Sequence, residues 1–153
     1  MANINLGPAS TSNANTVNVL TPVNTLTNPG PQGLDALRLI ASARGVSLAA
    51  TGDAAVMPVI NAGSYVPTVV ITTNATGGTV AGVSLGVFTA AAAGGTAVKS
   101  NGALTGQTTQ TFAFVQAATA AATLLTAQNL FVNVGTAVAG TTTDLFVYGY
   151  DVT

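Results

Sequence analysis

From residue 46 onward, apolar and polar residues alternate in short runs. The clearest run, residues 83–89, places Val83, Leu85 and Val87 on one side of an extended chain, as in a half-buried strand. Similar runs cover residues 46–50, 54–60, 65–73, 96–99, 109–115, 129–134 and 143–150. Turns that contain glycine separate the runs at intervals of roughly 8–12 residues, which is typical of an antiparallel sandwich or barrel. We therefore expect an all-β protein built as an antiparallel β-sandwich.

Three local signals refine this pattern. Pro58 lies within a strand-like run and predicts an edge strand or a bulge, because proline has no N–H to donate to a neighbouring strand. The dipeptide Asn101-Gly102 predicts a turn. Lys99 is the single lysine of the chain, and we expect it in a loop or on an edge strand, where its charge opposes pairing with another sheet.

Residues 34–44 are the one segment with helical spacing. Leu34, Leu37 and Ile40 recur every three residues, and Gly45 would end the helix. Alternation within the same segment also allows a strand. We favour one short surface helix that lies over the end of a sheet.

Residues 1–33 differ from the rest of the chain. They contain no charged and no aromatic residue, and they hold four of the six prolines. Such a segment cannot bury enough apolar area to fold alone, so we predict an extended N-terminal arm followed by a sandwich domain over residues 34–153. The arm is either a loose terminus or a segment that orders against a neighbouring subunit. A short strand pattern favours the second possibility and makes Val17, Val19 and Leu20 candidate interface residues.

The aromatic residues all lie at or beyond Tyr65, which assigns the core to the later part of the chain. Phe146, Tyr148 and Tyr150 share one side of the last predicted strand. This stripe is either sandwich core or a contact face, since tyrosine is enriched at protein interfaces and its hydroxyl needs a partner when buried. We take these three residues as further interface candidates.

Composition excludes most chemistry. The chain of 153 residues has no His, no Cys and no Glu, so thiol or histidine catalysis, zinc binding and disulfides are excluded. Three Lys and Arg residues are too few for the basic surface that nucleic acids require. We expect no enzyme activity, no catalytic or metal-binding residue, no cofactor and no nucleic-acid partner.

The four acidic residues are all aspartates, and they are scattered. Asp53 follows a glycine, and we expect it to shape a turn by bonding to nearby backbone. Asp144 and Asp151 flank the last predicted strand and would lie about 23 Å apart if that strand is fully extended. That distance is too long for the paired carboxyl groups of a glycosidase.

The expected surface is unusual because charged residues make up 5% of the chain and the net charge is -1. Charge depletion is typical of interface cores, so we expect much of the surface to lie against other subunits. The alternative is a wet surface of Thr, Asn, Ser, Gln and Gly. No run of 18 apolar residues and no secretory signal pattern is present, so we expect no membrane partner and synthesis in a cytoplasm.

Taken together, these features resemble the capsid decoration (cement) proteins of tailed double-stranded DNA bacteriophages. The likeness rests on a small, weakly charged β protein with a polar arm, and on an order of strand and turn sequences between residues 50 and 152. The sequences are Thr-Gly-Asp at 51–53, Val-Met-Pro-Val-Ile at 56–60, Ala-Gly-Ser-Tyr-Val at 62–66, Val-Ile-Thr-Thr-Asn-Ala at 70–75, Gly-Val-Phe-Thr-Ala at 86–90, Leu-Phe-Val-Asn-Val at 130–134 and Asp-Leu-Phe-Val-Tyr-Gly-Tyr-Asp at 144–151.

The resemblance implies a jelly-roll-like sandwich that forms a homotrimer. It implies a virion location, on the outer surface of an assembled capsid, where the protein would stabilise joints between major capsid proteins. The arm departs from the shortest members of this class. An alternative is an adhesin or fibre module of a phage or cell surface that binds glycans.

Overall fold

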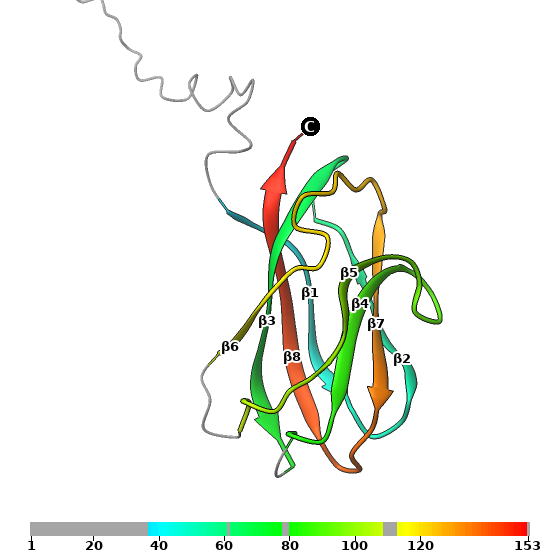
Figure 1. Ribbon diagram of the computed structural model, residues 1–153, viewed down its shortest axis with the longest axis vertical. Coiled ribbons are helices and arrows are strands. Elements are labelled where there is room, and N and C mark those ends of the chain that lie inside the picture. The colour runs from blue at the N-terminus through cyan, green and yellow to red at the C-terminus, as the bar shows by residue number, and fades with distance from the viewer. Residues whose placement is uncertain (1–36, 61, 78–79, 109–112, 153) are drawn as a thin grey trace, which may run out of the picture. The chain divides into compact units, whose positions relative to one another are not determined.

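The computed structural model describes residues 37–60, 62–77, 80–108 and 113–152 (Figure 1). These residues form eight strands in two antiparallel sheets, and they contain no helix. The strands are β1 (Arg38–Ser47), β2 (Gly52–Pro58), β3 (Tyr65–Thr76), β4 (Ser84–Ala90), β5 (Gly94–Ala103), β6 (Phe114–Ala117), β7 (Asn129–Thr136) and β8 (Thr142–Asp151). The prediction of an all-β antiparallel sandwich is confirmed. The predicted arm, residues 1–33, lies outside the described residues.

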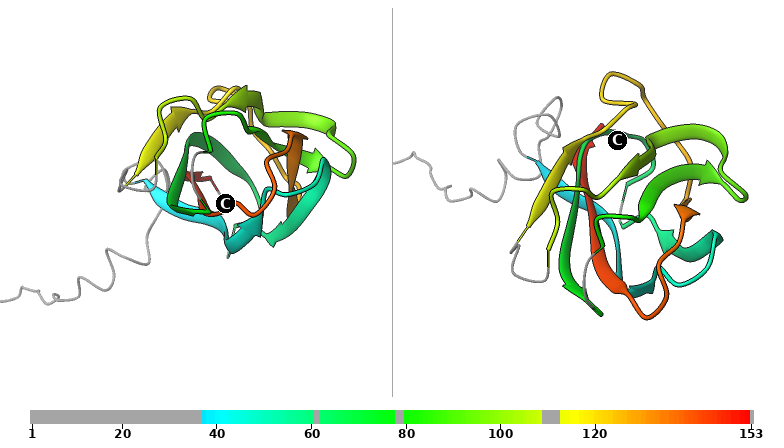
Figure 2. Two further views of the ribbon diagram at one scale, coloured as in Figure 1. Left: turned by 90° about the horizontal axis from the view of Figure 1, so that it is seen from below. Right: turned by 60° about the horizontal axis from the view of Figure 1, so that its bottom comes forward.

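Each sheet has four strands, and the two sheets face each other (Figure 2). The first sheet has the order β1-β8-β3-β6, and the second has the order β2-β7-β4-β5. Strand β1 pairs with β8, β2 with β7, β3 with β6 and β4 with β5. This is the pairing of one long hairpin rolled up on itself, which is the topology of a jelly roll.

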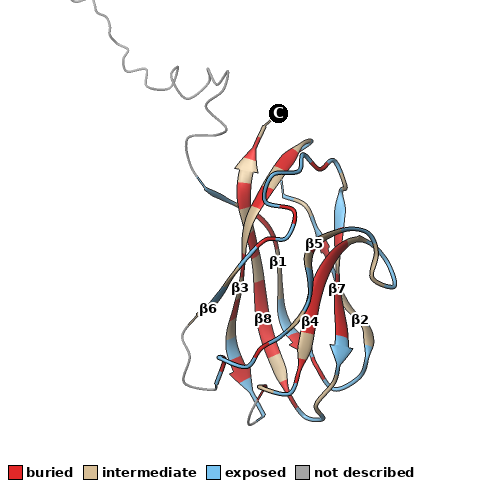
Figure 3. Cartoon of the chain, in the orientation of Figure 1, coloured by how far each residue is buried: buried red, intermediate tan, exposed pale blue. Residues whose placement is uncertain are grey.

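The core lies between the two sheets and is built by buried residues of seven strands, while β6 adds the partly buried Phe114 (Figure 3). Leu85 and Val87 of β4 are fully buried, and they pair with Val134 and Val132 of β7. The buried position of Val83, Leu85 and Val87 confirms the side predicted from the alternation of the chain.

The helix predicted over residues 34–44 is wrong for the part that the structure describes, because β1 begins at Arg38. A bulge follows Leu39, so that Ile40 and Ala41 are both buried although they are consecutive. Beyond the bulge, Ser42 faces outward opposite Phe146. The extra residue of the bulge interrupts the alternation that would have identified this strand.

The turn predicted at Asn101-Gly102 is also wrong, because both residues lie inside β5. Gly102 pairs with Leu85 of β4. The Asn101 side chain lies over Gly86, where an added Cβ would come within 2.7 Å of the Asn101 Oδ1 atom. The dipeptide therefore serves close packing between strands and not chain reversal.

Each edge strand of the second sheet has a feature that opposes pairing with another sheet. Pro58 ends the edge strand β2, as predicted. Lys99 lies on the edge strand β5, and its Nζ atom donates to the Ser100 carbonyl at 2.8 Å. The Thr119 N–H donates to the Val98 carbonyl at 2.7 Å, so the loop after β6 covers part of the same edge.

Candidate protein-interaction face

The middle of the outward side of the first sheet is apolar across all four strands, and the paired Thr73 and Asp144 mark its polar end. The residue pairing between neighbouring strands shows which side chains lie on this side, away from the core. We call this set the aromatic face: Leu39 and Ser42 of β1, Phe146, Tyr148 and Tyr150 of β8, Val66, Val69 and Ile71 of β3, and Val115 and Ala117 of β6. None of these residues is charged.

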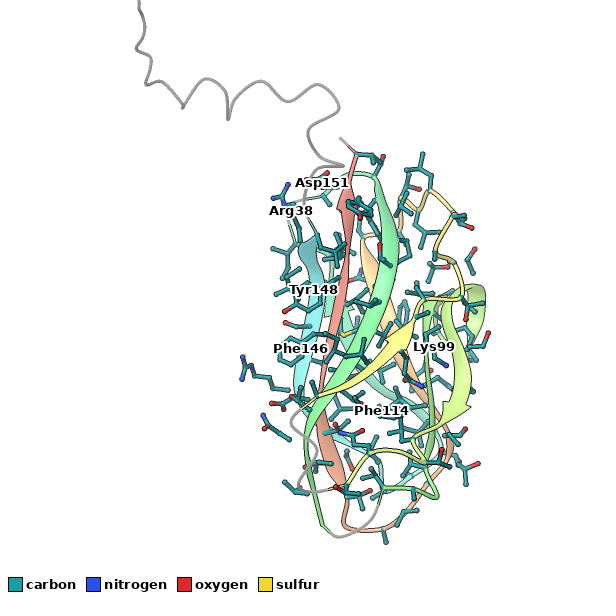
Figure 4. All side chains as sticks on the ribbon, turned by 60° about the vertical axis from the view of Figure 1, so that its left-hand side comes forward. Arg38, Lys99, Phe114, Phe146, Tyr148 and Asp151 are labelled. Carbon is teal, nitrogen blue, oxygen red and sulfur yellow. The ribbon has the colours of Figure 1, made fainter. Side chains whose placement is uncertain are left out.

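Strand β8 supplies the centre of the aromatic face. Tyr148 lies between Leu39 of β1 and Val69 of β3, and Phe146 lies between Ser42 and Ile71. Phe146 and Tyr148 project from the outer side of the sheet (Figure 4). The stripe of Phe146, Tyr148 and Tyr150 is therefore half-buried on an outer face, and the core positions of β8 belong to the residues between them.

The aromatic face is comparable in area to the largest apolar patch of a typical soluble monomer, and such patches are often functional. Strands about 4.8 Å apart and residues about 3.3 Å apart along them give the aromatic face an area of about 300 Å². Its rim is well exposed, since Val115 on the edge strand β6 is 59% accessible. Contiguous apolar patches of this size on a soluble protein are often interaction sites.

Charged groups lie at the two ends of the first sheet. At one end, Arg38 of β1 donates from Nη1 to the Asp151 carboxylate of β8 at 2.6 Å (Figure 4). At the other end, Arg44 Nη1 lies 3.9 Å from the Asp144 carboxylate. The region between these two ion pairs is uncharged, so a partner could cover it without removing a charge from water.

Asp144 connects three strands at its end of the face. Its carboxylate accepts the Gly45 N–H of β1 at 2.8 Å and the Asn74 Nδ2 of β3 at 2.7 Å. The Gly45 N–H lowers the pKa of Asp144 most, the Asn74 amide adds to this, and the Arg44 charge contributes least. Partial burial opposes the shift but does not reverse it.

Arg44 lies beside the aromatic face at the same end. Its guanidinium carbon is 5.4 Å from the centroid of the Phe146 ring, within the range of a cation–π contact. The side chain remains 74% exposed. The cation is therefore oriented by the ring while most of its surface faces solvent.

The outward side of the second sheet is different, because its polar groups bond to one another. The Asn101 amide donates to the Asn133 side chain at 3.2 Å, and Asn133 donates to Asp53 at 2.9 Å. Asp53 also accepts the Ala92 N–H at 2.7 Å, and the Asn133 and Ala92 bonds lower the pKa of Asp53. The expected local turn role of Asp53 is thus wrong, since these partners are 80 and 39 residues away.

The described residues contain no group of three His, Cys, Asp or Glu that could hold a metal ion. Asp144 and Asp151 lie at opposite ends of β8. No helix among the same residues is long and apolar enough to cross a membrane. The candidates Val17, Val19 and Leu20 fall outside the part of the chain that the structure describes.

Sequence reasoning found the aromatic stripe of β8 but missed its neighbours. Val66, Val69 and Ile71 belong to a strand that is apolar on both sides, as the printed sequence shows. A strand that is apolar on both sides indicates that another layer or a partner covers its outer side as well. The place of Arg44 beside Phe146 carries no local signal, because the two residues are about a hundred positions apart.

No protein-family model, no curated protein and no solved structure matches this chain.

Proposed function

We propose that this chain is a structural virion protein, a capsid decoration protein of a tailed bacteriophage. It binds the outer surface of the assembled capsid through the aromatic face and stabilises joints between major capsid proteins. The observation that carries the proposal is an uncharged patch of about 300 Å² on the outward side of the first sheet. The resemblance of the strand and turn sequences supports the choice of partner.

The proposed action is stabilisation by linkage. A protein that binds the assembled shell and not the free subunit shifts the equilibrium toward the shell. Each face of this size contributes modest affinity, but a protein that bridges several subunits adds the contacts together. The absence of charge within the aromatic face keeps the desolvation cost of each contact low.

The jelly-roll topology alone does not choose the function, because viral capsid domains and lectins both use it. A glycan presents many hydroxyl groups, and each needs a hydrogen-bond partner once buried. The aromatic face offers Ser42 and two tyrosine hydroxyls among aliphatic side chains. This composition fits an apolar protein surface better than a sugar, so the glycan-binding adhesin remains the second choice.

The experiment compares two matched valines on capsids that lack this protein. Val115 on β6 and Val56 on β2 are 59% and 54% exposed, and both lie on edge strands, but only Val115 belongs to the aromatic face. Val115→Asp would bury a charge in the contact and should weaken capsid binding about tenfold or more, whereas Val56→Asp should bind like wild type. Binding is measured by co-sedimentation.

The same capsids test the stabilising role. Capsids with bound wild-type protein should withstand higher temperature than capsids without it, as measured by release of packaged DNA on heating. An unchanged release temperature, or equal binding by the two valine variants, would overturn the proposal.

A further inference from the structure

We propose that Arg44 is the polar anchor of the aromatic face and binds a carboxylate on the capsid surface. This inference rests on the proposed function and names the partner chemistry: an Asp or Glu side chain beside an apolar patch. The argument depends on how Arg44 is held, on which of its donors are in use, and on what covering the face would require.

The Phe146 ring orients the Arg44 side chain but leaves its guanidinium N–H groups accessible. The Phe146 ring lies 5.4 Å from the guanidinium carbon and keeps the cation at the end of the aromatic stripe. The 74% exposure of the side chain shows that the contact covers a minor part of it. A guanidinium held at a ring loses less conformational entropy on binding than a free arginine would.

The donors of Arg44 are not used within the described residues. Its nearest acid, Asp144, already accepts hydrogen bonds from Gly45 and Asn74, and Arg44 Nη1 stays at 3.9 Å, beyond hydrogen-bond distance. Arg38 provides the contrast on the same strand, because its Nη1 donates to Asp151 at 2.6 Å. Of the two arginines of β1, Arg44 is the one whose guanidinium N–H groups donate no hydrogen bond within the described residues.

Covering the aromatic face would remove water from these donors. A cation that loses water without gaining an acceptor costs a large amount of free energy, so the partner must supply an acceptor at this position. A carboxylate fits best, since it matches the two parallel donors of a guanidinium and forms charge-assisted hydrogen bonds. Asp144 also faces the Arg44 guanidinium, but its carboxylate already accepts hydrogen bonds from Gly45 and Asn74.

The test measures binding to capsids that lack this protein, at several salt concentrations. Arg44→Gln should weaken binding about tenfold or more and reduce its salt dependence, because a desolvated charge pair is lost. Arg44→Lys should recover part of the affinity, since it keeps the charge but not the planar fork. Arg38→Gln is the matched control and should bind like wild type. Unfolding midpoints of all variants establish that each one folds.

The outcomes separate this inference from the proposed function. If wild-type protein does not bind capsids, the proposed function fails. If wild type binds and Arg44→Gln binds equally well, the anchor role of Arg44 fails. A weaker Arg44→Gln with unchanged salt dependence would mean an uncharged acceptor and would overturn the carboxylate. If Arg44→Gln changes the mass of the free protein but not capsid binding, a second copy of the chain occupies the face, and the assignment is also overturned.

Discussion

Asp144 shows how a single side chain fixes one end of the first sheet. Its carboxylate bonds to Gly45 at the second bulge of β1 and to Asn74 near the end of β3. Gly45 has a φ of 60°, in the left-handed region that glycine adopts without strain. The chain therefore places a glycine and an acid about a hundred residues apart so that the bulge is held from across the sheet.

The lowered pKa of Asp144 predicts an acid-dependent contribution to stability. Because the folded pKa lies below the ordinary value of 3.8, the contribution is present above pH 3.8 and is lost as the pH falls through the lowered value. Asp144→Asn should reduce the free energy of unfolding by about 1–2 kcal/mol at pH 7. Urea unfolding of both proteins between pH 7 and pH 2.5 checks this.

The difference between the two proteins should shrink toward the acid end of that range. A difference that stays constant at every pH would mean that the charge of Asp144 makes no contribution and that the lost hydrogen-bond acceptor accounts for the whole effect. The substitution keeps the size of the side chain but replaces one of the two acceptor oxygens by an NH2 group, so it is the change of the difference with pH that isolates the charge.

Among the connecting elements, the segment between β5 and β6 contributes to the core. Gln107 is fully buried, accepts the Thr72 hydroxyl hydrogen at 2.7 Å and donates to the Thr143 hydroxyl at 3.4 Å. Thr143 in turn donates to the Thr73 carbonyl at 2.7 Å. Gln107 thus joins this segment to β3 and β8 by hydrogen bonds inside the sandwich.

Gln107→Leu should destabilise the protein by about 2 kcal/mol, because the buried Thr72 hydroxyl loses its acceptor. Gln128→Leu is the control, since Gln128 is exposed and bonds to the nearby Thr126 carbonyl, and it should change the stability by less than about 0.5 kcal/mol. The free energies come from urea unfolding. Equal effects of the two substitutions would contradict a structural role of the buried network.

At the scale of elements, the sequence predicted strands where alternation is regular and failed where it is interrupted. Residues 129–134 and 143–150 match β7 and β8 closely. Strand β1 was missed because its two register shifts break the period of two, and these shifts are fixed by its partner β8. The stripe of the interaction face was visible in the sequence, but the side it faces depends on pairings between distant strands.

At the scale of the whole molecule, the expected self-association can be tested by measuring the mass of the protein in solution. The resemblance to decoration proteins leads us to expect a stable trimer, three times the 14.9 kDa of one chain, and a net charge of -1 gives little protection against association. Light scattering should show this mass for the full chain. The same measurement without residues 1–33 locates the contacts: a retained trimer places them in residues 34–153, and a lost trimer places them in the arm. A monomer in both forms would contradict the expectation.

The rolled-hairpin pairing also determines when the protein can fold. Strands β4 and β5 are neighbours in sequence, but β1 must wait for β8, whose residues lie about a hundred positions later. Closing such long loops before any gain in contacts makes folding slow, with expected times of milliseconds to seconds or more. During synthesis β3 and β6 can pair first, but the first sheet is completed only once β8 is available to pair between β1 and β3. Until then the apolar strands of the first sheet stay exposed to solvent. The newly made chain is therefore prone to aggregate before it folds.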